Sequence, residues 1–343
     1  MGNEQKPANG TTPETEPAPS AQKPLQKKAA IQTVALIGLG AIGSYFADRL
    51  QDVLGDGLRL IADGSRARRL ASEGRIINGR QRFFHIVSPD EETGPADLVL
   101  ITTKMDGLRQ ALADVRRQVG PETLILTPLN GVESEEIAAS VYGWEHILYS
   151  LMRVSSVKSG SRVSYNPAVS YMEFGEKRND PAAPTDRVRR LAALFDRCGI
   201  RALVRPDMEL AIWEKFVCNV SENQVAALLR VPFGAWGASP DANLLRVLVA
   251  REVIAVARAK GVNIAPDYPE KDLEFLKSLP PDNMPSTLQD LLAGRKTEKE
   301  IFGGTMVRLG RALGVPTPLN EFLYHAIAVL EGQNDGTVPR VQG

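Results

Sequence analysis

Cysteine and histidine are scarce in this chain of 343 residues, which has two cysteines and three histidines. Cys198 and Cys218 form no disulfide framework and lack the spacing of a metal-binding pair. The histidines, His85, His146 and His325, are scattered and pair with no cysteine. The sequence therefore predicts no metal. Free thiols and the lack of a convincing signal peptide predict a cytoplasmic protein.

Net charge is also absent, because 41 lysines and arginines balance 41 aspartates and glutamates. This balance gives no reason to expect a nucleic-acid partner. The hydrophobic share of 43% and the charged share of 24% are typical of a globular protein, and the length predicts two domains. Residues 1–30 have almost no large apolar side chains, so we expect a disordered tail there, and a second short tail over 333–343.

Glycine has a defined place in residues 33–50, TVALIGLGAIGSYFADRL, which predict a strand, a tight turn and a helix opening at Ser44. The turn consists of Gly38, Leu39, Gly40, Ala41, Ile42 and Gly43. In a GxGxxG turn the first glycine permits the sharp bend, the second lets a pyrophosphate approach the backbone, and the third lets the helix pack closely on the strand. The helix N-terminus offers N–H groups to the phosphates. The stretch therefore predicts dinucleotide binding.

The next apolar run, 58–62, supports this interpretation. It ends at Asp63, about 20 residues beyond the turn, where a dinucleotide fold places an acid on the ribose hydroxyls. One alternative is a signal anchor, because residues 29–47 carry no charge and come after Lys27 and Lys28. Three glycines at phosphate-binding spacing argue against membrane insertion.

Strand and helix patterns alternate in the first half of the chain, which predicts a parallel sheet covered by helices. The expected strands are 33–38, 58–63, 97–102 and 122–127, and the expected helices are 44–54, 65–73, 106–118 and 133–141. We expect strands 147–156, 162–166, 169–174 and 200–204, with a helix at 185–198, to extend the same sheet.

Strand signals stop after residue 206, and the rest of the chain predicts helices only. They are expected at 207–230, 240–260, 268–278, 286–294, 298–313 and 318–331. Ser286 with Gln289, and Thr297 with Glu300, have the spacing of capping boxes. The sequence thus predicts a Rossmann-type α/β domain over 31–206 and an all-helical domain over 207–332, with a cleft between them.

Polar residues come directly after two of the predicted strands, where ligands bind in open parallel sheets. Lys104 comes after strand 97–102, and Asn130 comes after strand 122–127. Both are candidates to meet a cofactor or substrate. Lys104 could instead be an exposed lysine at a helix start, and Asn130 with Gly131 could simply form a turn.

The predicted helix 207–230 has a polar face. Lys215, Asn219 and Asn223 are spaced at intervals of four residues, and asparagine is a poor helix former, so the face is typical of a ligand site. Ser286 and Glu298 are further candidates. Local spacing alone also explains Ser286 as a helix cap and Glu298 as a first-turn carboxylate.

Together these segments resemble the ketopantoate reductase (2-dehydropantoate 2-reductase) family over about residues 33–331. The resemblance implies a Rossmann-type domain joined to an all-α domain like that of 6-phosphogluconate dehydrogenase. It also implies NAD(P)H-dependent reduction of 2-dehydropantoate to (R)-pantoate, in pantothenate and coenzyme A biosynthesis. Its implied roles are Lys215 as general acid, Glu298 at the reacting end, Asn130 and Lys104 orienting nicotinamide and substrate, and Asn219, Asn223 and Ser286 binding substrate.

Three residues depart from the family pattern. Leu129 stands where glutamine is common, and Thr287 stands where methionine is common. Asp63 stands where NADP-dependent members commonly carry an arginine, so its charge would repel a 2′-phosphate and favour NADH. Arg66 lies three residues further on and could reach a phosphate. The sequence therefore leaves NAD(H) and NADP(H) open, with Asp63 tipping the expectation to NADH.

Other functions fit parts of the pattern. The enzyme could reduce another branched 2-oxo acid, and opine-type, glycerol-3-phosphate and 3-hydroxy-acid dehydrogenases also join a dinucleotide domain to a helical one. A non-catalytic dinucleotide sensor would not need Lys215. We expect a small-molecule substrate and neither a nucleic-acid nor a membrane partner, and the resemblance leaves a homodimer open.

Overall fold

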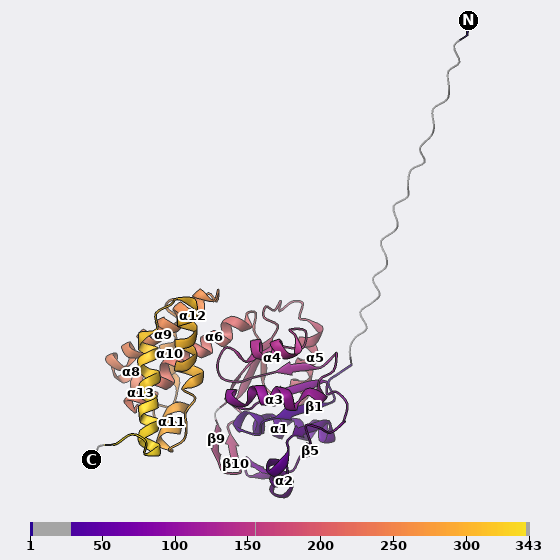
Figure 1. Ribbon diagram of the computed structural model, residues 1–343, viewed down its shortest axis with the longest axis horizontal. Coiled ribbons are helices and arrows are strands. Elements are labelled where there is room, and N and C mark those ends of the chain that lie inside the picture. The colour runs from indigo at the N-terminus through magenta and orange to yellow at the C-terminus, as the bar shows by residue number, and fades with distance from the viewer. Residues whose placement is uncertain (3–28, 155, 341–343) are drawn as a thin grey trace.

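The computed structural model describes residues 1–2, 29–154 and 156–340. The predicted N-terminal tail therefore lies almost wholly outside the described residues, as do the last three residues of the chain. An α/β N-terminal domain stands beside a helical C-terminal region, and α6 lies between the two (Figure 1).

The N-terminal domain is built on a five-stranded parallel sheet with the order β5-β2-β1-β6-β7. The order reverses between β1 and β6, and in such sheets ligands bind beyond the carboxyl ends of the strands at that point. Its apolar strands are buried because helices cover both faces. The strands are β1 (Val34–Ile37), β2 (Leu58–Ile61), β5 (His85–Val87), β6 (Leu98–Ile101) and β7 (Leu124–Leu126).

Helices α1 and α5 pack on one face of this sheet, and α3 and α4 pack on the other. Helix α1 begins at Ala41 rather than at the predicted Ser44, because Gly40 is already its N-cap. The predicted helix 106–118 is a short α-helix between two 3₁₀ turns. The bounds are α1 (Ala41–Leu54), η1 (Gly55–Gly57), α2 (Gly64–Glu73), η2 (Met105–Gly107), α3 (Leu108–Asp114), η3 (Arg116–Gln118), α4 (Ser134–Tyr142) and α5 (Asp186–Arg197).

The prediction that the four later strands extend this sheet was wrong, because 162–166 (β10) lies in a four-stranded sheet and the other three lie in a three-stranded one. Strands β9 and β10 join a four-stranded sheet, β4-β3-β10-β9, because an unpredicted hairpin at 75–82 offers them an edge. The remaining three form the sheet β12-β11-β8, which a bridge between Ile125 and Ile147 ties to β7. The bounds are β3 (Arg75–Ile77), β4 (Arg80–Arg82), β8 (Tyr149–Arg153), β9 (Ser156–Ser159), β10 (Arg162–Tyr165), β11 (Tyr171–Gly175) and β12 (Ala202–Val204).

The C-terminal region is helical, as predicted. Two predicted helices contain π-helical turns, a feature that often marks functional sites. The bounds are α6 (Met208–Cys218), η4 (Asn219–Asn223), α7 (Gln224–Leu229), α8 (Ala235–Ala238), α9 (Pro240–Ala259), α10 (Tyr268–Ser278), α11 (Ser286–Leu292), η5 (Glu300–Gly304), α12 (Thr305–Leu313) and α13 (Pro318–Asp335). Within the described residues, none of the helices has the length and apolar character that a membrane span requires.

The core of the helical region is shared with the N-terminal domain. Trp213 and Phe216 of α6 are buried in it, and so are Val132 and Leu151 from the N-terminal domain. The two parts of the chain therefore pack through apolar side chains as well as through polar contacts.

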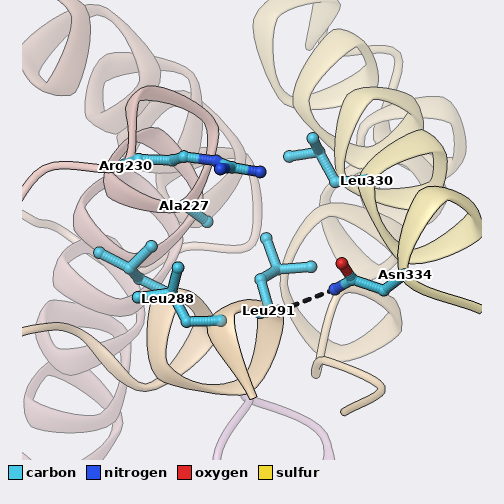
Figure 2. A pocket seen from close by; sticks show the side chains of 7 residues that line it. Ala227, Arg230, Leu288, Leu291, Leu330 and Asn334 are labelled. Atoms are coloured by element: carbon cyan, nitrogen blue, oxygen red, sulfur yellow. Dashed lines mark hydrogen bonds between the residues drawn. The ribbon is translucent and has the colours of Figure 1, made fainter. Parts of the chain in front are cut away.

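A small cavity lies among α7, α11 and α13 (Figure 2). Its volume is about 10 Å³, room for about one water molecule. Asn334 Nδ2 donates to Leu291 O at 2.7 Å beside it. This cavity is too small for an organic ligand, so the candidate site lies elsewhere.

Candidate functional site

The glycine turn has the shape that a dinucleotide needs. Gly38 has φ +96°, and a Cβ there would lie 2.6 Å from Thr103 N. A Cβ on Gly43 would lie 1.9 Å from Gly38 O. At Gly40 the nearest atom to a Cβ would be Thr102 O, 4.0 Å away, so that glycine is not closely packed. Two glycines thus permit the close packing of strand and helix, and the third leaves room for a phosphate.

The predicted residues around this turn are exposed. Asp63 comes after β2 and is the N-cap residue of α2, but its side chain caps no N–H group. Lys104 comes after β6, close to Thr102, whose hydroxyl donates to Gly38 O at 2.6 Å. Both side chains therefore lie at the carboxyl edge of the sheet, as predicted from the sequence.

Three predicted residues meet in one hydrogen-bonded chain. Lys215 Nζ donates to Asn130 Oδ1 at 3.1 Å and to Met152 O at 2.9 Å. Asn130 Nδ2 donates to Glu298 Oε2 at 2.9 Å. The amide of Asn130 therefore orients a cation and a carboxylate with its two ends. The three side chains come from separate parts of the molecule: helix α6, the loop after β7 and the loop before η5. These hydrogen bonds therefore form only in the folded protein.

The electrostatic setting of Lys215 suits proton transfer. Its side chain is buried, which lowers its pKa from 10.5 to about 8. The nearby charge of Arg153 contributes to the same shift of the pKa, while Glu298, Glu173 and Glu135 oppose it. An ammonium with a pKa near neutrality can both hold and release a proton at working pH.

The other predicted substrate residues do not join this chain of hydrogen bonds. Asn219 and Asn223 lie in the π turn η4, and their amides make no hydrogen bond within the described part of the molecule. Ser286 is exposed at the first turn of α11. Its predicted capping box was wrong, because Pro285 is the N-cap and Gln289 Nε2 donates to Met284 O instead.

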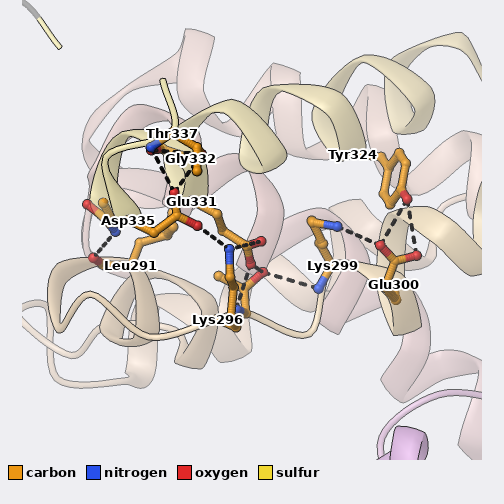
Figure 3. Close-up of polar contacts among 11 residues, drawn as sticks. Leu291, Lys296, Lys299, Glu300, Tyr324, Glu331, Gly332, Asp335 and Thr337 are labelled. Carbon is orange, nitrogen blue, oxygen red and sulfur yellow. Dashed lines mark hydrogen bonds and ion pairs between the residues drawn. The ribbon is translucent and has the colours of Figure 1, made fainter. Parts of the chain in front are cut away.

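A polar network holds the loop that carries Glu298 (Figure 3). Glu331 is buried and accepts hydrogen bonds from Thr297 N and Thr297 Oγ1, both at 2.7 Å. The predicted capping box of Thr297 with Glu300 was wrong, since Glu300 contacts Lys299 and Tyr324. Glu331 therefore fixes the residue next to Glu298.

Several site residues escaped the sequence analysis. The carbonyl of Met152 carries no side-chain signal at all. Glu135 is buried, and burial raises its pKa to about 7. Arg153 is the last residue of β8 and lies within the predicted strand 147–156, which shows no motif. The strand Tyr149–Arg153 does not alternate apolar and polar residues, so no signal in the sequence pointed to Arg153.

A second, partly buried cluster lies beside α6, although the sequence predicts no metal. The ligand atoms of Cys218, Glu222 and Asp272 lie within 4.8 Å of one another. Burial raises the pKa of Cys218 and Glu222, and the neighbouring Asp272 carboxylate raises both further. Arg246 Nη1 lies 3.9 Å from Asp272 Oδ2. The raised pKa values favour the neutral forms of Cys218 and Glu222, and the guanidinium of Arg246 faces the Asp272 carboxylate.

Comparisons with known proteins agree with this geometry. The ketopantoate reductase (PanE/ApbA) family model matches residues 34–179, and its C-terminal model matches residues 207–331. The chain belongs to the ketopantoate reductase family. It is therefore an NAD(P)-dependent oxidoreductase, and its fold is the predicted Rossmann-like domain with a helical region.

Individual relatives are distant. The 2-dehydropantoate 2-reductase of Aquifex aeolicus is 27% identical, over 86% of this chain and 96% of its own. The crystal structure of the Geobacter metallireducens enzyme of that name has a TM-score of 0.74 and 28% identity, covering 86% of this chain and 99% of its own. A D-mandelate dehydrogenase with NADH and anilino(oxo)acetate has a TM-score of 0.78 and 22% identity, covering 90% and 100%. The last likeness shows the fold alone.

Proposed function

We propose that the protein reduces 2-dehydropantoate to (R)-pantoate with a reduced nicotinamide dinucleotide. The proposal rests on one observation above all, the chain Lys215–Asn130–Glu298 in a member of this family. A lysine held by a neutral amide and a carbonyl, with a pKa near 8, is the group that a carbonyl reduction needs.

Each residue of the site has its own part in this reaction. Nicotinamide, when bound, supplies the hydride to C2 of the oxo acid. Lys215 uses two of its three Nζ donors on Asn130 and Met152, which leaves one for the substrate oxygen. The ammonium stabilises the charge that develops on that oxygen and gives it a proton. Glu298 accepts a hydrogen bond from Asn130 and is thereby held near the reacting end of the substrate.

The amides of Asn219 and Asn223 and the hydroxyl of Ser286 are proposed to bind the rest of the substrate. Asn223 is 8% exposed, and its side-chain amide has no hydrogen-bond partner in the described part of the chain, although it is not among the fully enclosed polar groups. The amide is therefore open to a ligand. Substrate hydroxyl or carboxyl oxygens would supply the missing partners. Lys104 is proposed to lie beside the cofactor, because it follows β6 at the switch point of the sheet.

We infer that NADPH is the preferred cofactor, against the expectation drawn from Asp63. Partial burial and four neighbouring cations, Arg75, Lys104, Arg66 and Arg69, lower the pKa of Lys158. Arg75 also donates to the carbonyl of Leu39 in the glycine turn. So dense a group of like charges favours a ligand with more phosphates than NADH carries.

The test is the loss of reduced-nicotinamide absorbance with 2-dehydropantoate and either NADPH or NADH. We expect turnover, with a higher kcat/KM for NADPH, and none in the Lys215→Met variant. Turnover with NADH alone would reject the preference for NADPH and support the expectation drawn from Asp63. No turnover of 2-dehydropantoate, together with turnover of another branched or aromatic 2-oxo acid, would keep the enzyme class and replace the substrate.

The assembly is open to test as well. A dimeric ketopantoate reductase from Staphylococcus aureus has a TM-score of 0.71 and 19% identity, covering 88% of this chain and 99% of its own. By that likeness we propose a homodimer. Analytical ultracentrifugation should give twice the mass of one chain, and a mass of one chain would reject the dimer.

A further inference from the structure

Arg153 lies on the face of β8 that is turned toward the helical region. Side chains alternate along a strand, so Leu151 and Arg153 share one face and Met152 points to the other. Leu151 is packed in the core of the helical region, whereas Met152 is packed in the core of the N-terminal domain. The guanidinium of Arg153 therefore faces α6.

The contacts of Arg153 leave its outer nitrogens free. Its Nε lies 3.4 Å from Glu173 Oε1, and the side chain is 33% exposed. Glu173 is nearly buried and also pairs with Arg205, whose Nε lies 3.2 Å from Glu173 Oε2. Among the residues that the structure describes, neither Nη atom of Arg153 has a hydrogen-bond partner. Tyr171 and Glu173 on one side and Cys218 and Tyr268 on the other raise the pKa of Arg153, although burial opposes them.

Arg153 is also a neighbour of Lys215. The carbonyl that accepts a hydrogen bond from Lys215 Nζ belongs to Met152, the residue before Arg153. The charge of Arg153 is close enough to lower the pKa of Lys215. The Arg153 guanidinium, with two free nitrogens, is thus a neighbour of the Lys215 ammonium. That ammonium is the group proposed to bind the oxygen on C2 of the substrate.

We propose that Arg153 binds the carboxylate of the 2-oxo acid through its two Nη atoms. This inference rests on the proposed function and names the group that recognises the acid. In a 2-oxo acid the carboxylate is bonded to the carbonyl carbon. Two adjacent hydrogen-bond donors with positive charge therefore suit its two oxygen-bearing groups, and Lys215 and Arg153 provide them. Guanidinium groups match carboxylates with two parallel hydrogen bonds. Asn219 and Asn223 are neutral and then serve the branched end of the substrate.

The experiment compares the acid with its uncharged lactone. Steady-state kinetics are measured for wild type, Arg153→Gln and Arg153→Lys, each with 2-dehydropantoate and with the lactone of the same acid. Arg153→Gln should raise KM for the acid about 30-fold or more and leave kcat/KM for the lactone within about threefold. Arg153→Lys should fall between. Arg205→Gln, which removes the other partner of Glu173, is the matched control and should leave both substrates unchanged.

Two results would overturn the proposal. An equal loss with acid and lactone would make Arg153 structural, and an unchanged KM for the acid would assign the carboxylate to other groups. If wild type reduces neither compound, the proposed substrate is wrong, and calorimetry of oxamate binding to the enzyme–dinucleotide complex then decides. Oxamate should bind wild type at least tenfold more tightly than Arg153→Gln, and equal affinity would reject the role of Arg153.

Discussion

Lys215 is the residue on which the proposed chemistry depends most directly. Replacement by methionine keeps the apolar stem of the side chain and removes its ammonium. We expect kcat to fall by about 10² to 10⁴, because general acid catalysis contributes that much, while dinucleotide affinity stays the same. Stopped-flow reduction and fluorescence titration of the dinucleotide measure the two quantities. Activity within tenfold of wild type would exclude Lys215 as the acid.

The pKa of about 8 for Lys215 gives the reaction a pH dependence with a definite sign. Reduction needs the protonated amine, so kcat/KM for reduction should fall as pH rises through about 8. Oxidation of the alcohol needs the neutral amine, so its kcat/KM should rise over the same interval. Both pH profiles are measured in one series of buffers. A flat reduction profile from pH 6 to 10 would contradict the assignment.

At the scale of the element, the glycine turn separates a packing role from a binding role. Gly43→Ala would place a methyl 1.9 Å from Gly38 O, so we expect a loss of about 3 kcal/mol in the free energy of unfolding. Gly40→Ala would place a methyl 4.0 Å from Thr102 O, an ordinary van der Waals contact, and should change stability by less than about 1 kcal/mol.

The same Gly40→Ala variant should weaken dinucleotide binding at least tenfold, because the added methyl occupies the place of the phosphate. Urea unfolding and fluorescence titration of both variants test the pair. If Gly40→Ala binds the dinucleotide like wild type, the phosphate lies elsewhere.

The loop before η5 is a second element with a testable role. Glu331 holds both the N–H and the hydroxyl of Thr297, and removing a partner from buried donors costs about 1–3 kcal/mol. We expect Glu331→Ala to lower stability by that amount. It should also lower kcat, since Glu298 is the next residue after Thr297. Asp335→Ala, at the exposed end of the same network, is the control. Normal kcat in Glu331→Ala would show that Glu298 is positioned independently.

At the scale of the whole molecule, the shared core predicts that the N-terminal domain and the helical region unfold together. Leu151 is 1% exposed and belongs to the core of the helical region. Leu151→Ala should cost about 2–5 kcal/mol, and helix circular dichroism and dinucleotide binding should be lost at the same urea concentration. Val141→Ala, at an exposed position of α4, should change neither. Two separate transitions would show that the parts are independent.

Some features of the fold were predicted correctly from the sequence, and others were missed or wrong. The strand, glycine turn and helix at 33–50 depend on local spacing and were correctly predicted, apart from the start of α1. The hairpin at 75–82 was missed because each of its strands has only three residues and the second, Arg-Gln-Arg, has no apolar side chain. Both capping boxes were wrong, because their partners Gln289 and Glu300 found other hydrogen bonds in the folded chain.

By itself the sequence determined the features that depend on periodicity and fixed spacing: the parallel sheet, the dinucleotide turn, the helical region and the candidate residues Lys215, Asn130 and Glu298. These features depend on contacts within about one or two elements. The tertiary structure alone decided that these three side chains join in one chain of hydrogen bonds and that Arg153 stands next to them. It also decided the lowered pKa of Lys215, because desolvation and Coulomb interaction depend on groups that are far apart in the sequence and meet only on folding.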